Sequence, residues 1–188
     1  RIVTILDSGT YNELVYINAG GGFGVDITIQ GDAGQLPILD GNGLSDVGGI
    51  SNGPTSVGPT VPSITTLKNI KFIRFSSGNG ALRGDRSLSN GGAFQVSDCE
   101  FDNNDKVAQD LASTSAKINT FNRCKFTRNT IFIGNSYDIY AELTNCVFGG
   151  VEDESCIDFG SGRTNSKVQN CSVVVNMDDS SIAIRAGV

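Results

Sequence analysis

The stretch VSDCEFDNN at residues 96–104 recurs in the chain with the same order of residue types. A second copy, FNRCKFTRN, occupies residues 121–129, and looser copies are LKNIKFIRF (67–75), LTNCVFGGV (143–151) and VQNCSVVVN (168–176). The central residues of successive copies are 29, 25, 22 and 25 positions apart. Self-similarity at such a period indicates stacked repeats that bury a common core.

Each copy has apolar residues at three matching positions, and the residues between them are mostly polar, with Val147 an exception. Alternation of this kind predicts strands with one buried face. The paired polar residues before the centre predict a corner, because Asn and Asp accept the left-handed backbone that a sharp bend needs. Stacked coils lie about 4.8 Å apart, so matching side chains form columns. The predicted core ladder consists of Ile70, Cys99, Cys124, Cys146, Cys171, Phe72, Phe101, Phe126 and Phe148.

We therefore predict an all-β fold: a right-handed, single-stranded parallel β-helix (solenoid) of about seven coils with long loops. A β-sandwich is the alternative, but it does not require the Cys and Phe columns to keep register. Helical periodicity is weak, and only residues 105–117 are compatible with a short helix.

A single domain is predicted over residues 1–188, because this length suffices for one core. All four Pro lie between residues 37 and 62, in a Gly- and Ser-rich stretch. Residues 35–64 are therefore predicted to leave the solenoid as a loop, and residues 76–92 as a second loop.

The composition excludes several classes of function. The chain has no His, which rules out His-based acid–base or triad chemistry and leaves zinc and haem sites unsupported. We expect no metal and no cofactor. The net charge of −6 argues against nucleic acid as a partner. No run of 18 apolar residues occurs, so no membrane span is expected.

The five Cys residues fit two states. Four occupy the ladder column, where buried thiols act as small apolar groups. Bridges Cys99–Cys124 and Cys146–Cys171 fit as well, because neighbouring coils bring Cα atoms within disulfide range. Cys156 stands outside the column.

The sequence resembles the right-handed parallel β-helix, or pectin-lyase-like, superfamily. The resemblance is carried by residues 3–34, in which Gly9–Tyr11 follows a strand pattern and Ile27–Gly31 comes one coil later. A narrower resemblance, to repeats of chlamydial-type polymorphic outer-membrane proteins, is carried by Gly91-Gly92-Ala93 and by the Phe-x-x-Asn motifs 101–104 and 126–129. In such a motif Phe fills the core and Asn can stack its side-chain amide in the turn.

Pectin-methylesterase-like enzymes of this superfamily use two Asp, an Arg and Gln donors. Gln109-Asp110 and the segment from Asp158 to Arg163 are similar to that family's motifs. Asp110 and Asp158 are 48 residues apart, or two coils, which corresponds to about 9–10 Å. That separation is long for a nucleophile and an acid acting on one ester. We interpret the similarity as chance and predict no catalytic residue, with Asp110, Asp158 and Arg163 as the alternative.

Both ends of the chain read as strands without an amphipathic capping helix. Open solenoid ends present unpaired strand edges, so we expect another copy or flanking domains to cover them. The favoured function is a non-enzymatic structural or adhesive module, extracellular or at a cell surface, that stacks into filaments or a surface layer. A polysaccharide or surface partner fits this function. The alternative is an esterase- or lyase-type carbohydrate-active enzyme, or a polysaccharide-binding domain, of the pectin-lyase-like class.

Overall fold

The structure is a computed structural model in which β-strands are the only regular elements of the described part of the chain. The strands are short, and every paired strand runs parallel to its partner. The all-β fold of stacked coils predicted from the repeat is confirmed. The described residues are 1–17, 26–42, 44, 49–52, 64–76, 80–84, 93–109, 118–129, 131–134, 141–149, 157–158, 166–174 and 184–185.

Two sheets of seven strands form two sides of the solenoid. The first sheet has the order β1 (Ile2–Ile5), β4 (Ile27–Gly31), β7 (Ile64–Lys68), β10 (Ala93–Ser97), β13 (Asn119–Asn122), β16 (Ala141–Thr144) and β19 (Lys167–Gln169). The second sheet has the order β2 (Thr10–Tyr11), β5 (Ile38–Asp40), β8 (Lys71–Ile73), β11 (Glu100–Asp102), β14 (Lys125–Thr127), β17 (Val147–Gly149) and β20 (Ser172–Val174).

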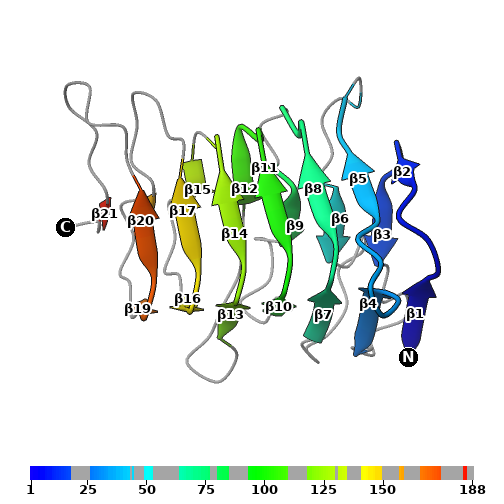
Figure 1. Cartoon of the computed structure of the whole chain (residues 1–188), viewed down its shortest axis with the longest axis horizontal. Helices are drawn as coiled ribbons and strands as arrows, with labels where there is room; N and C mark the ends of the chain where they lie inside the picture. The colour runs from blue at the N-terminus through cyan, green and yellow to red at the C-terminus, as the bar shows by residue number, and fades with distance from the viewer. Residues whose placement is uncertain are drawn as a thin grey trace, which may run out of the picture.

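A third sheet closes the remaining side. It contains β3 (Val15–Ile17), β6 (Ile50–Asn52), β9 (Leu82–Gly84), β12 (Lys106–Gln109) and β15 (Ile131–Gly134). A separate parallel pair joins β18 (Ile157–Asp158) and β21 (Ile184–Arg185). Figure 1 shows the strands stacked side by side along the long axis of the molecule, in chain order from blue to red, with the termini at opposite ends.

The number of turns differs from the prediction. The solenoid has about four turns, and the expectation of about seven is wrong. The first two sheets have seven strands each, but the third has five in the described part of the chain, so not every pass through the first two sheets is matched by a described strand on the third side.

Strands also occur inside stretches for which the sequence suggested other structure. Residues 35–64 contain β5 and β6, and residues 76–92 contain β9; residues 53–63 and 85–92 lie outside the described part. The suggested helix over 105–117 is wrong at its start, where β12 pairs with β9 on one side and β15 on the other. Pairing on both edges outweighs a weak local helix preference.

The corners between the first and second sheets have left-handed backbone in successive coils. The residue before each ladder centre has a φ of 52° to 55°; these residues are Asn69, Asp98, Arg123, Asn145 and Asn170. The corners also continue the ladder from coil to coil: the backbone N–H of Asp98 donates to the Asn122 carbonyl at 3.1 Å, and that of Arg123 to the Thr144 carbonyl at 3.0 Å. In these two-residue corners the left-handed residue therefore turns the chain without leaving its amide unpaired.

The core contains the aromatic column that the repeat predicts. Phe72, Phe101, Phe126 and Phe148 stack with ring centroids 4.9, 5.2 and 4.7 Å apart and interplanar angles of 6°, 9° and 11°. Phe121 of the first sheet meets Phe101 and Phe126 edge-on at 6.3 and 6.1 Å. All five rings are buried. Offset stacks and edge contacts are the arrangements that aromatic quadrupoles favour.

Two buried Asn side chains close the next corner. Asn104 donates through Nδ2 to Oδ1 of Asn129 at 2.9 Å and to the Phe72 carbonyl at 3.2 Å. Asn129 donates to the Phe101 carbonyl at 2.9 Å and accepts the Asn104 backbone N–H at 3.1 Å. The amides stack one coil apart, which explains the Asn of the Phe-x-x-Asn motif as a hydrogen-bonding element of the turn.

Candidate functional site

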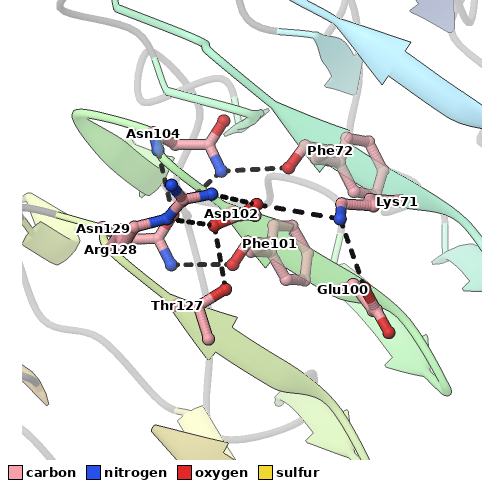
Figure 2. A network of polar contacts seen from close by, with 9 residues as sticks. All are labelled: Lys71, Phe72, Glu100, Phe101, Asp102, Asn104, Thr127, Arg128 and Asn129. Carbon is pink, nitrogen blue, oxygen red and sulfur yellow. Dashed lines mark hydrogen bonds and ion pairs between the residues drawn. The ribbon is translucent and has the colours of Figure 1, made fainter. Parts of the chain in front are cut away.

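A network of charged side chains lies on the outer face of the second sheet (Figure 2). Arg128 donates Nε–H and Nη2–H to the two carboxylate oxygens of Asp102, at 2.9 and 2.7 Å. The Thr127 hydroxyl donates to the same carboxylate at 3.0 Å. Lys71 Nζ lies 3.7 Å from Asp102 and 3.6 Å from Glu100. The carboxylate of Asp102 thus joins side chains from three successive strands, β8, β11 and β14.

Two further Asp–Arg pairs repeat this arrangement at other corners. Arg123 makes a bidentate contact with Asp98, with both distances at 2.7 Å. Arg74 contacts both oxygens of Asp40, with Nε at 3.0 Å from Oδ1, and the backbone N–H of Asn42 donates to the same Asp40 oxygen at 3.0 Å. Arg is suited to this role because its planar fork matches the two oxygens of a carboxylate.

These contacts hold the three carboxyl groups in their ionised form. Hydrogen bonds from Arg74 and from Arg123 lower the pKa of Asp40 and of Asp98, respectively. At Asp102 burial opposes ionisation, but hydrogen bonds from Arg128 and Thr127 outweigh it and the pKa is lowered. A carboxylate so paired is a poor general acid, because its proton is lost well below neutral pH.

The candidate catalytic residues fall largely outside the described part of the chain, so their arrangement stays a prediction. Asp110 and Arg163 lie outside the described residues, and of Asp158 only the backbone is described, in register with Arg185 across β18 and β21. Cys156 and the Gly91-Gly92 pair also lie outside. In the described part of the chain, no group of three or more His, Cys, Asp and Glu side chains is arranged to hold a metal ion.

The outer face of the first sheet has a different character from that of the second. Its outward positions form two columns along the seven strands, and most of them carry uncharged hydroxyl or amide side chains. The register aligns the first column as Ile2, Thr28, Thr66, Gln95, Thr120, Glu142 and Lys167. The second column is Thr4, Gln30, Lys68, Ser97, Asn122, Thr144 and Gln169.

An apolar surface is exposed at the β1 end of the solenoid. Val3 belongs to the inward column of the first sheet, where it aligns with Ile29. Val3 is 48% exposed, whereas Ile29 is 6% exposed and Leu67, one coil further, is fully buried. Leu6, the residue after β1, is 74% exposed. The side chains of the inward column are therefore buried inside the stack and exposed to solvent at the β1 end.

The sequence held a signal for the Asp–Arg pairs that the repeat interpretation did not use. Asp98 and Arg123 both precede their ladder centre by one residue, so stacking alone places them side by side. Arg128 follows its centre by four residues and Asp102 follows its centre by three, so this pair joins neighbouring columns. Opposite charges in one column of a parallel stack predict contacts between coils.

No protein-family model, curated protein or solved structure matches the chain. Among the residues that the structure describes, no helix has the length and apolar character needed to cross a membrane.

Proposed function

We propose that the chain is a non-enzymatic structural module, extracellular or at a cell surface, whose β1 end binds a second copy of the same chain. The observation that supports this is the burial along one inward column of the first sheet. Leu67, Val96, Phe121 and Leu143 are at most 1% exposed, whereas Val3 at one end is 48% exposed.

A coil from another molecule would complete this column with the contacts that the inner coils already make. Each inner strand pairs on both edges, and β1 pairs on one edge only, with β4. At the other end of the column Val168 is partly exposed. A head-to-tail contact between two such ends does not close on itself, so it extends into a filament. The interior stacks provide rigidity along the axis of that filament.

The test is the state of association of the purified chain from low to high concentration, by sedimentation and by electron microscopy. We expect concentration-dependent linear assemblies. Val3→Lys should abolish them, because a buried ammonium at the joint lacks a partner. Val147→Lys is the matched control, since Val147 is 44% exposed on the side of the solenoid and away from the joint. A chain that stays monomeric at high concentration, or assemblies that persist in folded Val3→Lys, would overturn the proposal.

The second candidate is a polysaccharide-binding domain or carbohydrate-active enzyme, as the pectin-lyase-like resemblance implies. The outer face of the first sheet favours binding, because its hydroxyl and amide side chains can hydrogen-bond to a neutral glycan along several coils. Pull-down on insoluble neutral glycans, with Thr120→Arg on this face and Val147→Arg as control, tests binding. Turnover of polyuronides or their methyl esters that is lost in Asp158→Asn would establish the enzyme instead.

A further inference from the structure

Four Cys side chains form a column at the corner between the first and second sheets. Backbone hydrogen bonds stack them one coil apart: Lys125 N–H donates to the Cys99 carbonyl at 3.0 Å, Val147 N–H to that of Cys124 at 3.0 Å, and Ser172 N–H to that of Cys146 at 2.9 Å. Neighbouring parallel strands lie about 4.8 Å apart, which falls within the range of Cα separations in disulfides.

The thiols of the column point the same way. Cys146 donates to the Thr144 carbonyl of its own coil at 3.3 Å and to the Phe121 carbonyl of the preceding coil at 3.5 Å. Cys171 repeats the pattern with the Gln169 carbonyl at 3.3 Å and the Leu143 carbonyl at 3.6 Å. The Cys171 sulfur therefore leans toward the coil that carries Cys146.

Accessibility distinguishes one member of the column. Cys99, Cys124 and Cys146 are 1%, 2% and 1% exposed, whereas Cys171 is partly exposed. A dissolved reagent can therefore react with Cys171 directly, whereas the buried Cys146 thiol reacts only with the sulfur of Cys171.

The pKa values of Cys146 and Cys171 shift in opposite directions, because partial burial raises that of Cys171. Hydrogen bonds from the Cys124 thiol and backbone, and from the Cys171 thiol, lower the pKa of Cys146 to about 7 against the opposing effect of burial. Burial raises the pKa of Cys99 to about 12. Thiolate at Cys146 is thus available near neutral pH, and the thiolate is the form that attacks a disulfide.

We propose that Cys146 and Cys171 are a redox-active dithiol that closes into a disulfide between neighbouring coils, with a small-molecule disulfide such as oxidised glutathione as the oxidant. The Cys171 thiolate, after releasing its proton to solvent, attacks one glutathione sulfur and expels the first glutathione thiolate. The Cys146 thiolate then attacks the Cys171 sulfur and expels the second. Two protein thiols lose two protons and two electrons, and the glutathione disulfide is reduced to two thiols.

The bond would link the β16–β17 coil to the β19–β20 coil. On the β19–β20 coil the inward residue Val168 is partly exposed. Cys99 and Cys124 stay as packing thiols, since no oxidant reaches them from solvent. The bond forms within one chain, but Cys171 lies on the β19–β20 coil that the proposed head-to-tail joint would cover, so the test uses the chain at a concentration at which it is monomeric.

The test equilibrates the whole chain with reduced and oxidised glutathione, quenches with acid, blocks free thiols with N-ethylmaleimide and maps the peptides by mass spectrometry. We expect three of the five thiols to stay free and a peptide linked through Cys146 and Cys171. Without oxidant, N-ethylmaleimide should modify Cys171 at least about ten times faster than Cys99, because reactivity follows exposure and thiolate content.

Three variants separate the steps. Cys146→Ser should stop at one glutathione bound to Cys171, Cys171→Ser should block the reaction, and Cys99→Ser should leave the linked peptide unchanged. Linkage of Cys124 to Cys146, linkage of Cys156 to Cys171, or free Cys171 in a fully oxidising buffer would each overturn the proposal.

Discussion

Replacing Phe126 by Ala should destabilise the solenoid more than any single change on its surface. The ring is 3% exposed and lies between two parallel rings, with centroids 5.2 Å from Phe101 and 4.7 Å from Phe148, and meets Phe121 edge-on. Truncation of a buried Phe to Ala costs about 3–5 kcal/mol in free energy of unfolding, which includes the cavity that it leaves. We expect the upper part of this range, because rigid coils on both sides hinder collapse into the cavity.

The assay is urea unfolding followed by circular dichroism and near-ultraviolet absorbance. With a slope of about 2–3 kcal/mol per molar urea, a loss of about 4 kcal/mol lowers the midpoint by about 1.3–2 M. Lys125→Ala is the matched control, because Lys125 precedes Phe126 on β14 and is exposed to solvent. Its midpoint should move by less than about 0.3 M, as a surface change of under 0.5 kcal/mol implies. A Phe126→Ala midpoint within 0.5 M of the parent (roughly 1 kcal/mol) would refute the stacked core.

Two other predictions concern the polar ladders. Asn129→Ala removes the hydrogen-bond partners of the Phe101 carbonyl and of the Asn104 backbone N–H. The free energy of unfolding should therefore fall by about 1–3 kcal/mol for each group left unsatisfied. Gln95→Ala is the control and should change this free energy little, because Gln95 is exposed. Equal urea midpoints for the two variants would contradict the buried amide stack. The pKa values of Asp40, Asp98 and Asp102 are lowered in the folded chain, which predicts that the fold is less stable in acid. A carboxyl group whose folded pKa lies below its unfolded value of about 3.9 stabilises the fold above about pH 3.9. This stabilisation is lost as the pH falls toward the folded pKa. The urea midpoint should be level from about pH 7 to 5 and drop below about pH 4. Arg128→Gln removes hydrogen bonds that lower the pKa of Asp102, so it should lower the midpoint at neutral pH and make the drop on acidification smaller. A profile that Arg128→Gln leaves unchanged would count against the Asp102 contact.

The charged pairs also decide what the carboxylates at the edges of the second sheet can do chemically. These carboxylates come from neighbouring coils, as a catalytic pair on a β-solenoid would. A guanidinium contacts both carboxylate oxygens of each of three residues, Asp40, Asp98 and Asp102. That arrangement links coils and stabilises register, and it leaves these three carboxylates without the free oxygen that proton transfer needs.

The local sequence was sufficient for the parts of the fold that each coil builds alone. Alternation around Cys99 and Cys124 predicted the inward Phe residues, and Asn69, Asp98 and Asn145 predicted the left-handed corners. Both features depend on residues within a few positions of one another, which is the range over which side-chain direction and backbone preference act. The Phe column then followed from equal spacing in successive copies.

Only the tertiary structure decided the third side, the number of turns and the contacts between coils. The strands β6, β9 and β12 share no repeated motif, and each is defined by a partner 26 to 35 positions away in the chain. Parallel pairing needs a long crossover, so neither the partner nor its register can be read from the strand itself. For the same reason the Arg that neutralises Asp40 stands 34 residues away. The sequence by itself determined the backbone bends and the side-chain directions within one coil, and stacking determined the contacts between coils.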